Sequence, residues 1–257
     1  MGEPLVSIVT PTKNREKFLS HAYAGICAQT LREWEWLVDD DSASPSEFMK
    51  GLSDGRVKYH HDTTPRTLGA KRNDLIARAR GEIIAQFDDD DYYAPKYLST
   101  MVGALRERGA DFVKLSGWFL LGAIDGSFGY WNTEVRTGLR FRCDGREAKP
   151  VMLSEEDGTA FSSENGFGFS YVFKRELWEK TKFRDVNFAE DGHFQREAIE
   201  GRSMMYVVDQ GGICLHILHG KNTACCFPQY LLPPFMVRVL FPGAGNYLNA
   251  MMGDRGK

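Results

Sequence analysis

Short apolar runs alternate with helix-forming stretches over residues 1–115, and this alternation limits the folds that the chain can adopt. The apolar runs of strand length lie at residues 5–10, 35–38, 57–61 and 82–87. Between them, apolar side chains recur at the spacing of one helix face. Strands that alternate with helices form a parallel sheet covered on both faces. The sequence therefore predicts an α/β fold.

Two acidic clusters end strands of this predicted sheet. Asp39–Asp41 end the second strand, and Asp88–Asp91 follow the fourth. Parallel strands bring their carboxyl ends to one edge of the sheet, where α/β proteins bind ligands. We therefore expect both clusters to face one crevice. Adjacent carboxylates repel one another, and a divalent cation with oxygen ligands relieves that repulsion. A solvated acidic turn before the helix near Pro95 is the alternative for the second cluster.

The second half of the chain is less regular. We expect its strands at residues 111–121, 128–131, 171–173, 204–208 and 213–218. Helices are expected over 175–180 and from Glu190 to Ile199. Residues 133–164 suggest loops and short strands, and 163–168 suggest a functional loop or a simple turn. The apolar tail, 225–252, favours packing on the core or on a partner chain over a membrane surface.

The bulk composition excludes several classes of protein. A net charge of −3 gives no general argument for binding nucleic acid or membranes. No apolar run is long enough for a transmembrane helix. The five cysteines include no C-x-x-C pair, which argues against a disulfide framework and a zinc site. This cysteine usage is typical of a reducing compartment, so we expect a cytoplasmic protein.

Five short motifs occur in order along the chain. They are VSIVTPTKNR at 6–15, VDDDS at 38–42, GAKRN at 69–73, FDDDD at 87–91 and ED at 190–191. In these motifs, and over roughly residues 5–223, the chain resembles the family 2 glycosyltransferases of the GT-A fold, which use nucleotide-diphosphate sugars. Two positions depart from the family pattern. Asp41 stands where glycine is usual, and Lys71 stands where alanine is common.

The resemblance implies a nucleotide site at the ends of the early strands. Its implied residues are Thr10, Pro11, Arg15, Asp39, Asp40, Arg72, Asp88 and Asp89. Asp40 would accept a hydrogen bond from the base, with Asp39 as the alternative. Arg15 and Arg72 would donate to phosphate or base, although solvated surface arginines are the commoner case. The additional charge of Asp41 would lie near the base.

The same resemblance implies a metal site and a general base. Asp90 would bind Mn²⁺ or Mg²⁺ together with His219, and Asp88 would bind ribose or reach the metal through water. His216 is the alternative histidine. Asp191 would take the proton from the acceptor hydroxyl, with Glu190 beside it to bind the acceptor or orient the site. Carboxylates that merely favour a helix N-terminus are the other interpretation of this pair.

Taken together, these features predict a GT-A fold with a Rossmann-like, mostly parallel sheet flanked by helices and a smaller mixed sheet on the acceptor side. We expect residues 1–115 to bind the donor, 116–223 to bind the acceptor and carry catalysis, and 224–257 to form the apolar tail. The predicted activity is inverting transfer of a sugar, from a UDP-sugar by preference, to a glycan or lipid-linked saccharide in polysaccharide biosynthesis. A nucleotidyltransferase on a related fold and a catalytically silent sugar-binding module are the alternatives. The tail offers a contact to the inner face of a membrane or to a second copy of the chain.

Overall fold

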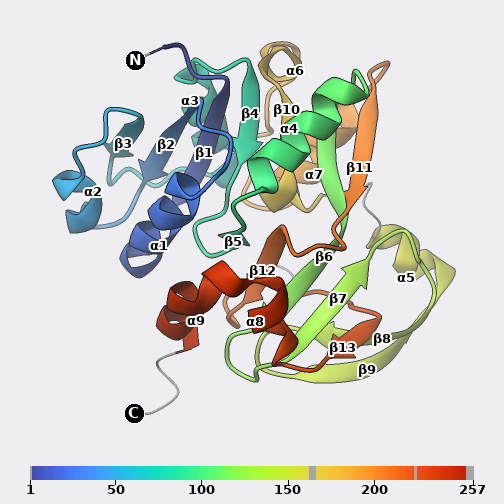
Figure 1. Ribbon diagram of the computed structural model, residues 1–257. Helices are drawn as coiled ribbons and strands as arrows, with labels where there is room; N and C mark the ends of the chain where they lie inside the picture. Colours follow the sequence, from blue (N-terminus) through green and yellow to red (C-terminus); the bar gives the residue numbers. More distant parts are fainter. Residues whose placement is uncertain (1, 162–165, 223–224, 253–257) are drawn as a thin grey trace. The chain divides into compact units, whose positions relative to one another are not determined.

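The computed structural model describes residues 2–161, 166–222 and 225–252 (Figure 1). The chain divides into two compact units. The first unit comprises residues 1–89, 98–114 and 164–206. The second comprises 90–97, 115–163 and 207–257.

A parallel set of four strands forms the centre of the first unit. The strands are β1 (Val6–Thr12), β2 (Trp34–Asp40), β3 (Val57–His61) and β4 (Ile83–Gln86), in the order β4-β1-β2-β3. β10 (Val172–Lys174) adds antiparallel to β4 and to the start of β6 (Phe112–Gly122). The expected strand at 57–61 has the predicted bounds. β1 continues two residues past its expected end because Pro11 and Thr12 stay in register with Asp39 and Asp40 of β2.

The first four helices of the first unit alternate with strands, as predicted, and the last two follow β10 one after the other. The helices are α1 (Glu16–Cys27), α2 (Glu47–Gly51), α3 (Leu68–Ala77), α4 (Tyr97–Glu107, in this unit from residue 98), α6 (Arg175–Lys180) and α7 (Glu190–Ala198). α2 begins with a serine cap. The N-cap is Ser46, whose extended backbone stays outside the helix while its hydroxyl accepts a hydrogen bond from the Met49 amide at 3.1 Å.

An aromatic core holds α7 against the sheet of the first unit. Phe194 of α7 packs on Phe183 with ring centroids 4.0 Å apart and on Phe173 of β10 at 5.1 Å. Phe112 and Tyr171 continue the cluster at 4.8 Å from one another. These rings are all buried. Burial of such large apolar side chains fixes the position of α7 on the sheet. This helix carries Glu190 and Asp191.

The second unit continues β6 and adds strands on both of its sides. β12 (Cys214–Leu218) runs parallel to β6, and β5 (Tyr92–Tyr93) pairs with β12. On the other side lie β7 (Phe128–Asn132) and then β13 (Tyr230–Leu232), both antiparallel to their neighbours. β8 (Gly138–Cys143) and β9 (Ala148–Leu153) form a separate two-stranded sheet. The remaining short elements are η1 (Gly168–Ser170), in the first unit, and β11 (Met204–Val208), which begins in the first unit and ends in the second.

One helix lies where only loops and short strands were expected. α5 (Glu155–Ala160) begins with a capping box, in which Ser154 and Asp157 exchange side-chain and backbone hydrogen bonds. The Ser-x-x-Asp spacing was the signal for this helix in the sequence.

The apolar tail packs on the core of the second unit, as the sequence favoured. α8 (Met236–Leu240), η2 (Pro242–Ala244) and α9 (Gly245–Met252) contribute Val237, Ala244, Tyr247 and Leu248 to this core. Phe241 contacts Tyr92 and Phe119, with ring centroids 6.1 and 5.7 Å apart. Phe235 and Val239 remain exposed. Of the helices in the described ranges, none combines the length and the apolar character needed to cross a membrane.

Candidate active site

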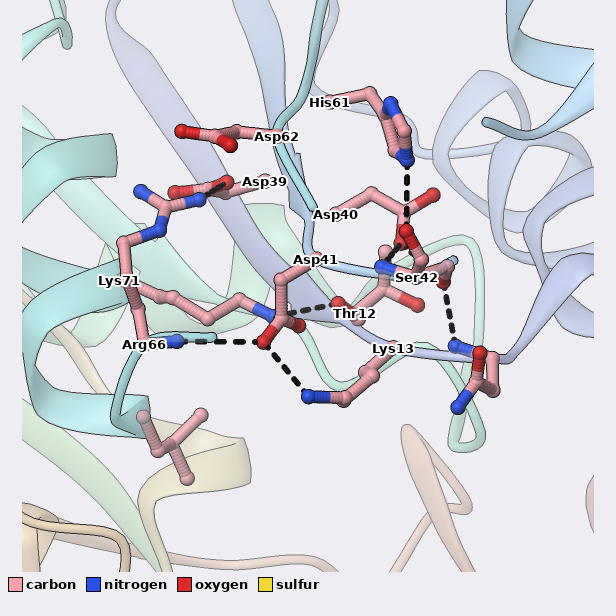
Figure 2. Close-up of polar contacts among 12 residues, drawn as sticks. Thr12, Lys13, Asp39, Asp40, Asp41, Ser42, His61, Asp62, Arg66 and Lys71 are labelled. Carbon is pink, nitrogen blue, oxygen red and sulfur yellow. Dashed lines mark hydrogen bonds and ion pairs between the residues drawn. The ribbon is translucent and has the colours of Figure 1, made fainter. Parts of the chain in front are cut away.

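Asp39 and Asp40, which end β2, and Asp41, which follows it, are buried and have separate partners (Figure 2). Asp40 accepts hydrogen bonds from the Ser42 amide at 2.9 Å and the Tyr59 hydroxyl at 2.7 Å. Burial and the neighbouring Asp40 charge raise the pKa of Tyr59 well above its usual value. Both of these donors are neutral, and a carboxylate has lone pairs left for a further donor.

Asp39, by contrast, faces cations. Its carboxylate pairs with the Arg66 guanidinium and with Arg78 at 3.4 Å, and the His60 ring nitrogen lies 3.4 Å from it. Asp39 has no exposed surface. Because these cations already compete for its oxygens, Asp39 is the less suitable of the two carboxylates for a neutral base.

The two departures from the family pattern lie against one another. The Lys71 ammonium contacts Asp41 Oδ1 at 2.7 Å and donates to the Thr12 carbonyl, while Lys13 contacts Asp41 Oδ2 at 3.0 Å (Figure 2). Lys71 and Asp41 are both buried. Burial favours the neutral form of Asp41, but its hydrogen bonds to the two lysines lower its pKa below the usual value. The sequence did not show that these positions form an ion pair.

Thr12 joins the two predicted acidic clusters within the first unit. Its carbonyl accepts from Lys71, the partner of Asp41, and its hydroxyl donates to Asp89. Arg15 lies 3.7 Å from Asp89. Thr12 was not among the predicted site residues. Of the predicted neighbours, Thr10 is buried and accepts from the Trp36 indole at 2.9 Å, and Pro11 lies opposite Asp39 in the β1–β2 register.

Arg72 is buried, which excludes the solvated-surface interpretation of this residue. Its guanidinium contacts Gln86 Oε1 at 2.6 Å, Glu190 Oε1 at 3.3 Å and Asp88 Oδ1 at 3.8 Å. Burial opposes the charge of Arg72, yet the surrounding carboxylates raise its pKa above the usual value. Burial also raises the pKa of Glu190, and Arg72 offsets only part of that effect.

Asp191 lies at the first turn of α7, next to Glu190. Its Oδ2 accepts from the Gly168 amide at 2.7 Å, and its Oδ1 accepts from the Gly192 amide at 2.7 Å. Asp191 is partly exposed, whereas Glu190 is buried. In the first unit, the Arg72 guanidinium therefore interacts with Asp88 and with both carboxylates of the predicted catalytic pair, Glu190 and Asp191. Residues 163–165 of the predicted functional loop lie outside the described residues.

The second unit holds two carboxylate–histidine pairs. The carboxylates are those of Asp90 and Asp91, at the start of the 90–97 segment of this unit. Asp90 Oδ2 lies 2.8 Å from His219 Nε2, and Asp91 Oδ2 lies 2.8 Å from His216 Nδ1. Asp91 also accepts from the Ile217 amide at 2.8 Å. Asp91 thus holds the His216 ring in place. Burial would disfavour the charge on His216, but Asp91 raises its pKa well above the usual value.

The residue types at Asp90 and His219 fit a divalent metal. A carboxylate oxygen and an imidazole nitrogen converge there, and the Asp90 and Asp91 oxygens lie within 4.8 Å of one another. Carboxylate with imidazole suits Mn²⁺, whereas Mg²⁺ prefers oxygen ligands alone. His219 follows the end of β12, as the sequence predicted.

Comparisons with known proteins identify the family of the chain. The profile of the family described as "Glycosyl transferase family 2" matches residues 7–147. The putative colanic acid biosynthesis glycosyl transferase WcaA of Escherichia coli is 34% identical over 105 residues, which are 39% of this chain and 38% of the relative. A second relative from Escherichia coli is the UDP-Glc:alpha-D-GlcNAc-diphosphoundecaprenol beta-1,3-glucosyltransferase WfgD. It is 30% identical over 115 residues, 44% of this chain and 46% of the relative. The chain thus spans less than half the length of these two relatives.

A solved structure shares the fold. S. aureus TarS 1-349 in complex with UDP-GlcNAc matches with a TM-score of 0.64 and 15% sequence identity, covering 97% of this chain and 70% of that one. This likeness confirms the predicted GT-A fold, with its mostly parallel sheet in the first unit and its small separate sheet in the second.

Proposed function

The chain belongs to the family 2 glycosyltransferases, and we propose that it transfers a sugar, with inversion, from a UDP-sugar to the hydroxyl of a lipid-linked saccharide or glycan. The observation that carries the proposal is the constellation around Arg72. A buried guanidinium lies between Asp88 and Glu190, next to the partly exposed Asp191. The bound UDP-GlcNAc of TarS and the lipid-linked acceptor in the name of WfgD support the choice of donor and acceptor.

The donor nucleotide would bind at the ends of β1 and β2. Asp40 is the carboxylate that would accept a hydrogen bond from the base, because its partners are neutral hydroxyl and amide groups. Arg15 and Arg72 would supply positive charge to the diphosphate. The planar donor groups of their guanidinium ions suit phosphate oxygens. Arg15 pairs with Asp89 and Arg72 pairs with Asp88, and these ion pairs keep the two guanidinium groups oriented.

Asp191 would act as the general base. Inverting displacement at the anomeric carbon requires one carboxylate to take the proton from the attacking hydroxyl. Two backbone amides hold the Asp191 carboxylate in a fixed orientation. A catalytic group that is already held in position reacts faster than one that must first reach that position. Glu190 is buried and paired with Arg72, so it would orient the site and would not exchange protons with the acceptor.

Asp90 and His219 would hold the Mn²⁺ ion. A bound divalent cation supplies Lewis-acid stabilisation of the negative charge on the leaving diphosphate. Asp91 would keep His216 charged and oriented beside this position.

The test is a transfer assay with a matched control on the same helix. Purified protein is given a panel of UDP-, GDP-, CDP- and dTDP-sugars with Mn²⁺, and release of the nucleotide diphosphate is measured with and without diphosphoundecaprenol-linked acceptors. Asp191→Asn should lower turnover by about 10²–10⁴-fold, while donor binding stays unchanged. The control is Glu197→Gln, which removes an exposed carboxylate of α7 that pairs with Arg184 and should retain activity. Donor binding without any turnover in the wild type would instead indicate a silent sugar-binding module, and full turnover in Asp191→Asn would exclude the proposed base.

A further inference from the structure

Lys114 of β6 has no exposed surface, although lysine is among the residues that are least often buried. It belongs to none of the motifs in the sequence. A buried ammonium is costly unless hydrogen bonds and opposing charge or π-electrons compensate it. We propose that Lys114 is a positioning residue for Asp191, an inference that rests on the proposed role of Asp191 as general base.

The Lys114 ammonium contacts two elements of the first unit at once. It donates to the Gly166 carbonyl of the turn before η1 and to Gln195 Oε1 of α7 at 3.2 Å. The rings of Phe167 and Tyr171 lie with their centroids 5.3 and 5.2 Å from the ammonium. These distances are those of cation–π contacts. Lys114 therefore bridges the 166–168 turn and α7.

The turn that Lys114 holds is the one that contacts Asp191. Phe167 adopts a left-handed backbone, with φ 66°, which directs the Gly168 amide to Asp191 Oδ2 at 2.7 Å. The contact leaves no spare room. A Cβ on Gly168 would lie 2.8 Å from Asp191 Cβ, and one on Gly166 would lie 3.1 Å from Asp191 Oδ2. A shift of this turn therefore moves either the carboxylate or its amide donor.

The helix side of the bridge leads to the same carboxylate. Gln195 lies four residues after Asp191 on α7, so the two side chains project from the same side of the helix. Gln195 Oε1 also accepts from the Tyr171 hydroxyl at 2.7 Å, which fixes the acceptor that Lys114 uses. Because Lys114 is bonded to both the turn and the helix, it sets the spacing between Asp191 and the Gly168 amide.

Lys114→Met keeps an unbranched apolar stem, one atom shorter than lysine, and removes the donors. Turnover should fall about 10–100-fold, since misplacing a reacting group by about 1 Å costs a comparable factor. The Kd for UDP should stay within twofold of the wild type. The matched control is Lys174→Met in the neighbouring strand β10, where the lysine is partly exposed and pairs with Asp111. This control should retain turnover.

A double-mutant cycle separates positioning from a general structural role. In an Asp191→Asn background, Lys114→Met should lower the residual turnover by less than twofold, because the group that it positions has been removed. Gln195→Met removes the acceptor on the helix side and should show the same dependence on Asp191. Gln195→Met also tests the inference if Lys114→Met fails to fold. Equal losses in both backgrounds, or full turnover in Lys114→Met, would overturn the inference. Full turnover in Asp191→Asn alone would instead refute the proposed function.

Discussion

The buried ion pair between Asp41 and Lys71 allows a quantitative prediction. At 2.7 Å and an effective dielectric constant of about 20, the Coulomb attraction is about 6 kcal/mol. Desolvation of both groups offsets part of this attraction, and removal of one partner from a buried pair typically costs about 3–5 kcal/mol because the other charge is left uncompensated. Asp41→Asn should therefore lower the free energy of unfolding by about 3 kcal/mol. Lys71→Met should lower it by less, because Lys13 still pairs with Asp41 at 3.0 Å.

Urea denaturation and thermal melting measure this effect. For a chain of this size, about 3 kcal/mol corresponds to a decrease of about 6–12 °C in Tm. The double variant Asp41→Asn/Lys71→Met contains neither charge and should be less destabilised than the sum of the single variants, by about 2–3 kcal/mol. Additive losses, or a single variant as stable as the wild type, would refute the argument from the buried pair.

The pH dependence of the same pair has a definite sign. The pKa of Asp41 in the folded protein is lowered below its usual value of 3.8, so the unfolded chain binds this proton first as the pH falls. The stabilisation is therefore fully present above the unfolded-state pKa and is lost as the pH falls through the lowered one. The difference in stability between the wild type and Asp41→Asn should be constant from pH 6 to 8 and should shrink below pH 3.8. A difference that grows as the pH falls would contradict this assignment.

Three further predictions concern the first unit. Gly168→Ala should lower turnover about 100-fold, because its Cβ would press on Asp191, the proposed general base. By contrast, Gly103→Ala in α4 meets no neighbour within 4 Å and should stabilise the protein by about 0.5–1 kcal/mol in a melting experiment. Thr67→Ala removes the N-cap of α3, which accepts from its third helical amide at 3.1 Å, and should cost about 1 kcal/mol in urea denaturation. Arg72→Met should raise the Kd for UDP in calorimetry and lower stability by about 3–5 kcal/mol, since it leaves a buried carboxylate unpaired. The exposed Arg106→Met should change stability by less than about 0.5 kcal/mol, and an equal effect of both arginine variants would contradict the special role of the buried one.

Local sequence patterns predicted most of the elements. The strands at 57–61 and 204–208 and the helix at 175–180 have the predicted bounds, because apolar spacing within each segment agrees with its tertiary environment. β1 is longer than predicted because a neighbouring strand supplies partners for residues that resemble a turn. α5 was missed within a polar stretch whose capping signal is short.

The partners within the site were harder to predict than its residues. Asp41 and Lys71 are 30 positions apart in the chain, and Lys114 and Gln195 are 81 apart. No periodicity links such positions, so the sequence showed unusual residues without showing what they bind. Lys114 carried no signal at all, because a lysine in a strand is ordinarily exposed and becomes informative only when its burial is known.

The most direct test of the proposed glycosyltransferase site is isothermal titration calorimetry of UDP, GDP, CDP and dTDP, each with Mn²⁺ and with EDTA. We expect the wild type to bind UDP in a metal-dependent manner, and Asp90→Ala to lose the dependence on Mn²⁺. The control Asp74→Ala, which removes an exposed partner of Arg66, should bind like the wild type. If none of the four nucleotides binds with or without metal, the assignment of the donor site is wrong.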